Sequence, residues 1–347
     1  MGLNIWNKLK FRVRKYLRII GISMEKNKIF TYDDMYNGAL SLKQKLLDLS
    51  LSLPEDCDFI RGIKDSEFIL KRFKEGNYPD FNSEEQKKYA HMCALFNFNT
   101  WIERVGGIET IKKYNLVEHL RLFVAAKSIS PIYPTSDDMS RKLTELIVAL
   151  NLLRFADNVI IDDGKSPTRI PDIRFEINGS RFAIECKTIE TMNDEGIWKN
   201  VKTASEQINE INDPKLILGA PLLSMRNDKY YEGLFSKTIF ESFHDALSKF
   251  SGELKRALHP VQNENRFIDD MKSWKHDKTI HGFLLFENFI ARAKPYEKTA
   301  TEIKAVELIR LDEDIPEIFP KIVTDLNMHL QMQNYGQFFP NNERAKN

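Results

Sequence analysis

The sequence predicts a mixed α/β protein in which a helical segment precedes a mixed sheet flanked by helices. Residues 31–115 show helical periodicity, and residues 135–222 alternate between helical and strand patterns in the order α-β-β-β-α-β. Within that order, residues 170–189 have the pattern of a two-stranded hairpin around Asn178-Gly179. With 347 residues, 42% of them hydrophobic, the chain is long enough for about two domains.

Polar breaks at residues 53–56, 76–80 and 106–107 divide the helical segment. Residues 128–135 contain two prolines and three serine or threonine residues, a composition typical of a connector. We therefore expect a basic arm over residues 1–30, a helical domain over 31–130, a second domain over 131–325, and a helix end and tail over 326–347.

The second domain is expected to begin with a helix, because Thr135 and Asp138 have capping-box spacing and apolar residues follow at helical spacing to residue 155. A buried strand over 159–161, the hairpin, a helix over 198–211 and a strand over 215–222 follow. Beyond these, the patterns predict a long helix over 234–258, strands over 280–290 and 305–311, and a final helix over 319–332.

Positive charge is concentrated at the start of the chain. Residues 1–28 hold eight lysines and arginines against one glutamate, a net charge of +7, whereas the whole chain carries +1. Trp6, Phe11 and Tyr16 are interleaved with these cations. Such an arm could lie along nucleic-acid phosphates or on an anionic membrane surface, and a solvated helix explains it equally well.

Other patterns exclude several classes of protein. The three cysteines form no C-x-x-C pair, and no H-E-x-x-H motif occurs among the seven histidines, so neither a zinc site nor a disulfide framework is expected. No G-x-x-x-x-G-K-[ST] loop for nucleotide triphosphates occurs. No apolar run reaches the ~18 residues of a membrane span, and Arg18 interrupts the place of a signal peptide, so we expect a cytoplasmic protein.

The two-residue loop Asn178-Gly179 sets the hairpin register, in which the numbers of opposed residues add up to 357. One face is then apolar: Ile173, Phe175, Ile177, Phe182, Ile184 and Cys186. The other face places Asp172 opposite Glu185, with Lys187 two residues further on.

The Asp172–Glu185 pair needs an explanation, because opposed side chains lie ~4.5–5.5 Å apart and like charges there are destabilising unless they are neutralised. Mg²⁺ is the economical neutralising ion, since it takes one or two carboxylates and keeps several waters. Lys187 could lower the cost of deprotonating a water or hold the charge of a phosphate under attack.

Pro171-Asp172, followed after twelve residues by Glu185-Cys186-Lys187, resembles the P-D…(D/E)-x-K signature of the PD-(D/E)XK nuclease superfamily, which has the restriction-endonuclease-like fold. The order α-β-β-β-α-β is similar to that family's core, and the resemblance covers roughly residues 135–222. It implies that Asp172 and Glu185 ligate Mg²⁺, which Mn²⁺ can replace. It also implies that the Cys186 carbonyl can add a ligand and that Lys187 orients the attacking water.

The same resemblance implies supporting roles for an acid on the preceding helix, here Glu145, and for a polar residue on the following helix, here Gln207 or, second, Lys202. Glu145 lies on an apolar side of its helix, where a carboxylate without a partner is costly, unless it reaches water at the surface. Gln207 can equally be an ordinary exposed polar residue.

A second P-D…E-x-K arrangement begins at Pro79-Asp80 and ends at Glu85-Gln86-Lys87. Only four residues separate its acids, and the residues from position 83 onward have the pattern of a helix start. This arrangement therefore does not predict a site.

The sequence predicts a Mg²⁺-dependent phosphodiesterase. The resemblance implies that it acts on DNA, as an endonuclease rather than an exonuclease, because restriction and phage-defence nucleases are prominent in that superfamily. RNA remains an alternative substrate. The alternative functions are a catalytically inactive nuclease-fold protein that binds nucleic acid or mediates assembly, and a metal-free scaffold. The helical domain and the arm would recognise substrate, bind a partner protein or mediate self-association.

Overall fold

The computed structural model describes residues 30–76, 83–129, 142–162, 170–189, 194–211, 215–225, 238–241, 245–246, 248–249, 280–293, 301–311 and 315–331. The basic arm up to residue 29, the expected capping box at Thr135 and Asp138, and the tail from residue 332 lie outside the described residues.

The N-terminal half forms a helical layer of α2 (Tyr32–Asp48), α3 (Asp58–Lys74), α4 (Ser83–Arg104), α5 (Ile108–Lys113) and α6 (Val117–Ala125). Thr31 and Asp34 cap α2, because the Asp34 N–H donates to the Thr31 hydroxyl at 3.1 Å and the Thr31 N–H donates to the Asp34 carboxylate at 2.7 Å. Helix α6 lies beyond residue 115, where the helical pattern in the sequence ends, and within the helical domain expected over residues 31–130. None of the described helices is long and apolar enough to cross a membrane.

The C-terminal half begins with the predicted order of elements. These elements are α8 (Leu143–Leu152), β1 (Asp157–Ile161), β2 (Ile173–Ile177), β3 (Ser180–Ile189), α9 (Asp194–Asn209) and β4 (Leu216–Met225). They are followed by β5 (Ile239–Phe240), β6 (Gly282–Ala293), β7 (Thr301–Arg310) and α13 (Ile318–Gln331). The predicted mixed α/β class is therefore confirmed.

The long helix predicted over residues 234–258 is wrong at Ile239 and Phe240. These two residues form β5 and pair in parallel with Arg292 and Ala293 of β6. Isoleucine and phenylalanine suit a strand, and pairing with β6 outweighs the local helical periodicity. Residues 245–246 and 248–249 are helical, and the other residues of the segment beyond 241 lie outside the described part of the chain.

The sheet is mixed. Its strands follow the order β1-β2-β3-β4-β6, with β7 paired to β6. β1, β2 and β3 are antiparallel neighbours, β3, β4 and β6 are parallel neighbours, and β7 runs antiparallel to β6. The parallel strands β3 and β4 are joined by α9, which packs against both of them.

The hairpin of β2 and β3 has the predicted register, with Ile173 opposite Ile184 and Phe175 opposite Phe182. Asn178 and Gly179 have φ values of 53° and 77°, the positive values that a tight two-residue turn requires. The predicted apolar face packs into the main hydrophobic core. The local turn therefore decides which residues of the hairpin share a face.

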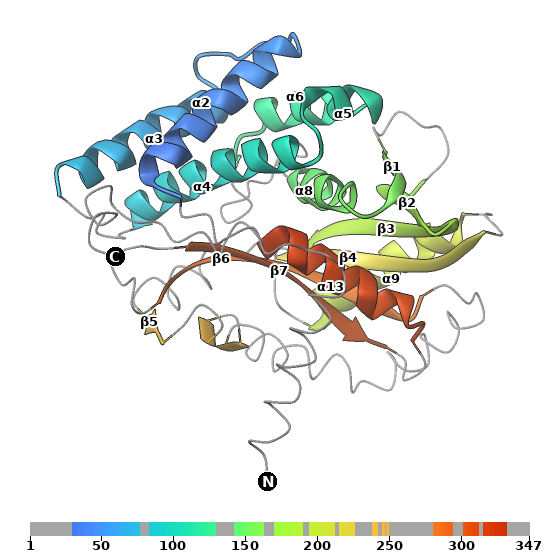
Figure 1. Ribbon diagram of the computed structural model, residues 1–347. Coiled ribbons are helices and arrows are strands. Elements are labelled where there is room, and N and C mark those ends of the chain that lie inside the picture. The colour runs from blue at the N-terminus through green and yellow to red at the C-terminus, as the bar shows by residue number, and fades with distance from the viewer. Residues whose placement is uncertain are drawn as a thin grey trace, which may run out of the picture.

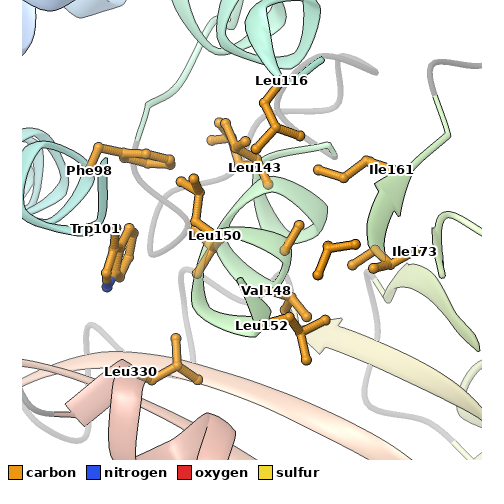
Figure 2. Packing of buried hydrophobic residues seen from close by; sticks show 14 of the residues in the cluster. Phe98, Trp101, Leu116, Leu143, Val148, Leu150, Leu152, Ile161, Ile173 and Leu330 are labelled. Carbon is orange, nitrogen blue, oxygen red and sulfur yellow. The ribbon is translucent and has the colours of Figure 1, made fainter. Parts of the chain in front are cut away.

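Helix α8 lies at the centre of the protein, and all ten of its residues are buried. Figure 2 shows its surroundings, to which the helical layer, the sheet and α13 contribute Phe98, Trp101, Leu116, Ile161, Ile173 and Leu330. One hydrophobic core thus extends from the helical layer through α8 to the sheet. The expected domain boundary near residue 130 lies outside the described residues and stays a prediction.

The two helices next to the hairpin cover opposite faces of the sheet (Figure 1). Gly219 of β4 lies directly under Ile208 of α9 and pairs with Ala183. The next pair, Ala220 and Ile184, belongs to the core around α8. Since successive residues of a strand point to opposite faces, α9 lies on the face away from α8.

Candidate functional site

Three carboxylates lie in one row across the ends of β1, β2 and β3. Ile161 pairs with Ile173, so the next residues outward, Asp162 and Asp172, are opposed, and the Asp162 N–H donates to the Asp172 carbonyl at 2.8 Å. The hairpin register sets Asp172 opposite Glu185 in the same way, and the Asp172 N–H donates to Glu185 Oε2 at 3.2 Å. Opposed residues share a face, so these acids converge at the open end of the hairpin.

The Asp172 carboxylate is anchored to the backbone of β3. Its Oδ2 accepts a hydrogen bond of 2.7 Å from the Cys186 N–H. Asp172 is half-buried, whereas Glu185 is 3% exposed. Each carboxylate therefore has one oxygen held by a backbone N–H from the opposite strand.

A lysine pairs with the buried glutamate of this row. Lys187 donates to Glu185 Oε1 at 2.5 Å, on the carboxylate oxygen that the Asp172 N–H does not use. The Lys187 side chain is 21% exposed and that of Glu185 is 4% exposed. The ammonium group therefore lies between the buried carboxylate and solvent.

Helix α8 adds a second acid–lysine pair at its N-terminal end. Glu145 is 6% exposed, and its Oε2 accepts a hydrogen bond of 2.9 Å from Lys142 Nζ. Burial, together with the negative charges of Asp172 and Glu185, raises the pKa of Glu145 from 4.5 to about 8, although Lys142 partly opposes the shift. The carboxylate of α8 therefore lies within electrostatic reach of the row on the sheet.

The other carboxylates experience the same conflict between burial and charge. Burial raises the pKa of Asp172, against the opposing effects of the Cys186 N–H and of the two lysines. Burial and the charge of Asp172 raise the pKa of Glu185, against the opposing effect of Lys187. Burial lowers the pKa of Lys142, but the charges of Glu145, Asp172 and Asp162 outweigh this effect, and its pKa is raised overall.

The cluster holds more acids than bases, which suits a cation. Glu145, Asp162, Asp172 and Glu185 supply four acidic groups, and Lys142 and Lys187 supply two ammonium groups. Within the described ranges, no group of three or more histidine, cysteine, aspartate or glutamate side chains has an arrangement that could hold a metal ion by itself. Mg²⁺ does not require such a cage, because it binds through one or two carboxylates and keeps its waters.

The Cys186 side chain is not a candidate ligand. It packs against the main hydrophobic core, as the sequence predicts. Burial, followed by the charges of Asp172, Glu145 and Glu185, raises the pKa of the Cys186 thiol well above its usual value. The thiol stays protonated, so only the backbone carbonyl of Cys186 is a possible ligand.

No family model, curated protein or solved structure matches the chain. Any assignment of chemistry therefore depends on the geometry and charge of this cluster. The cluster combines the carboxylates of Glu145, Asp172 and Glu185, which come from α8 and from two adjacent strands. Lys142 donates a hydrogen bond to Glu145, and Lys187 donates one to Glu185.

The two polar residues predicted on α9 are not joined to this cluster. Gln207 precedes Ile208 in α9. Ile208 packs over Gly219 of β4, and Gly219 pairs with Ala183, which lies two residues before Glu185 on β3. Among the described residues its Oε1 is buried without a hydrogen-bond partner. Lys202 is 43% exposed and lies 4.0 Å from Glu206 on the same helix. A supporting role of either residue stays a prediction.

Sequence reasoning missed Lys142 and Asp162. The signal for Lys142 was its position three residues before Glu145, a spacing that brings side chains together on one side of a helix. Asp162 directly follows the apolar strand residues of β1, but its pairing with Asp172 depends on the connection over residues 163–169, whose length does not set a register.

Proposed function

We propose that this chain is a Mg²⁺-dependent nuclease that hydrolyses phosphodiester bonds of DNA. One observation carries the proposal. Asp172 and Glu185 are opposed on neighbouring strands, each carboxylate accepts a hydrogen bond from a backbone N–H of the other strand, and Lys187 donates to the Glu185 carboxylate. The order of elements from α8 to β4 supports the further proposal of a restriction-endonuclease-like core and of membership in the PD-(D/E)XK superfamily.

Asp172, Glu185 and the Cys186 carbonyl would hold Mg²⁺, and Mn²⁺ could replace it. The buried carboxylates fit such a cation, because burial first, and the charges of neighbouring acids in addition, raise their pKa values despite the nearby lysines. When bound, the cation would stabilise negative charge on the phosphate under attack.

The residues of the chain have distinct tasks in this proposal. Lys187, held by Glu185 at the exposed side of the pair, orients the attacking water and faces the phosphate charge. The raised pKa of Glu145 lets its carboxyl group accept or release a proton near neutral pH.

An endonuclease acting on duplex DNA, in restriction or phage defence, follows from the resemblance to the superfamily alone.

The test compares wild type with Lys187→Ala on plasmid DNA, single-stranded DNA and RNA, each with Mg²⁺, Mn²⁺ or EDTA. We expect metal-dependent cleavage by wild type and a loss of about 100-fold or more in the variant, as for other groups that stabilise transition-state charge. Lys112→Ala is the control, because Lys112 is an exposed lysine that also pairs with a glutamate, Glu109. This control should cleave like wild type.

The outcomes separate the candidate functions. Cleavage that is lost in Lys187→Ala and in EDTA supports the nuclease. DNA binding without cleavage by wild type would instead support an inactive nuclease-fold module. Equal cleavage by wild type and Lys187→Ala would contradict the proposed role of this site.

A further inference from the structure

The cluster contains a second lysine whose task the nuclease proposal does not explain. Lys142 directly precedes α8, and its ammonium group donates to Glu145 Oε2 at 2.9 Å. The Lys142 side chain is 27% exposed, and that of Glu145 is 7% exposed. The lysine therefore extends from the accessible edge of the cluster to a carboxylate that solvent hardly reaches.

Lys142 and Lys187 are not interchangeable. Lys187 pairs with Glu185 on the sheet, and Lys142 pairs with Glu145 on the helix. Each ammonium group thus holds one of the two carboxylates that come from different layers of the protein. All ten residues of α8 are buried and seven of them belong to the main hydrophobic core, so apolar packing is the main contact of this helix.

We infer that Lys142 is a positioning residue of the candidate site, which acts by holding the Glu145 carboxyl group in place toward Asp172. This inference rests on the proposed function for its catalytic consequence, but not for the contact itself. Without Lys142, Glu145 would be a buried carboxylate near two others of like charge. Once ionised, such a group turns toward water, because an unpaired buried charge is strongly unfavourable.

The electrostatics of Lys142 agree with this role. The negative charges of Glu145, Asp172 and Asp162 raise the pKa of its ammonium group despite the opposing effect of burial. The i, i+3 spacing brings Lys142 and Glu145 together on one side of the helix start. A surface pair of the same spacing, Glu109 and Lys112, is 80% and 51% exposed and lacks this environment.

The experiment is a double-mutant cycle of Lys142→Gln and Glu145→Gln, with Lys142→Arg as the conservative variant and Lys112→Gln as the matched control. The first readout is the urea midpoint of unfolding at pH 9 in EDTA, which needs neither metal nor DNA. We expect Lys142→Gln to lower the midpoint when Glu145 is present and to leave it nearly unchanged in Glu145→Gln. Equal shifts in the two backgrounds would overturn the inference.

The second readout is plasmid cleavage with Mg²⁺, resolved into kcat and KM. We expect Lys142→Gln to lower kcat between about 10- and 100-fold, as for a misplaced catalytic group, with KM unchanged. Lys142→Arg should restore most of this loss, and Lys142→Gln should add no loss to Glu145→Gln. A raised KM, or losses that multiply in the double variant, would assign Lys142 to phosphate contact and overturn the inference.

The two readouts distinguish a failure of the nuclease proposal from a failure of the role inferred for Lys142. If wild type does not cleave, the nuclease proposal fails, and the urea cycle still decides whether Lys142 acts through Glu145. If wild type cleaves and both cycles are additive, the nuclease proposal stands and the role of Lys142 is refuted.

Discussion

Replacing Glu145 with glutamine is expected to stabilise the metal-free protein at neutral and alkaline pH. The carboxylate is 6% exposed and faces the charges of Asp172 and Glu185. Its pKa is raised from 4.5 to about 8. This rise of the pKa corresponds to a destabilisation of the folded protein by at most about 5 kcal/mol at pH values where Glu145 is ionised in both the folded and the unfolded state.

The direction follows from the proton that Glu145 holds. Between pH 4.5 and about 8 the folded protein keeps this proton and the unfolded chain has released it. Stability is therefore lost as the pH rises through this window, and the loss is complete above about pH 8. Glutamine carries no titrating proton, so Glu145→Gln removes this dependence. Lys142 tolerates the loss of its partner because it is partly exposed to water.

Urea denaturation in EDTA at pH 5, 7 and 9 measures the effect. The stability gained by Glu145→Gln over wild type should be small at pH 5 and should grow to at most about 5 kcal/mol at pH 9. Glu109→Gln, at an exposed glutamate of α5, is the control and should show no growing difference. A gain for Glu145→Gln that stays constant from pH 5 to 9 would refute the assignment of a buried, charge-crowded carboxyl group.

Three further substitutions test the fold around the site by urea denaturation. Gly219→Ala should cost about 1–3 kcal/mol, because its new methyl group would collide with the stiff side chain of Ile208 on α9; a neutral effect would contradict this packing. Asp58→Ala should cost about 1–3 kcal/mol, because it leaves the buried Ile129 N–H without the acceptor that it contacts at 3.1 Å, and an effect near zero would contradict that contact. Gly179→Ala should cost about 1 kcal/mol, since its φ of 77° disfavours a β-carbon, and unchanged stability would argue against the tight hairpin turn.

The hairpin was predictable because the residues that determine its turn and register lie within one short stretch of the sequence. Asn178-Gly179 selects a two-residue turn, the turn selects the register, and the alternation of the strands selects the face of each side chain. The opposition of Asp172 and Glu185 therefore follows from residues within a single stretch of the sequence. The burial of Glu145 followed in part from the apolar residues around it on its own helix.

The failed and missing predictions depend on contacts between distant segments. Residues 239–240 have helical periodicity in the sequence, but pairing with β6 makes them a strand. Asp162 joins the acidic row through the register of β1, which the connecting segment does not determine. Lys142 becomes part of the site only because α8 docks with its first turn beside the open end of the hairpin.

The amino-acid sequence by itself thus determined the class of the fold, the order of elements from α8 to β4, and the placement of Asp172, Glu185 and Lys187 on one face. Only the tertiary structure decided the charge balance, because that balance depends on which distant groups come within a few ångströms and how deeply they are buried. Helical periodicity and strand alternation act over a few residues, whereas the desolvation of Glu145 requires the helical layer, α8 and the sheet to pack together.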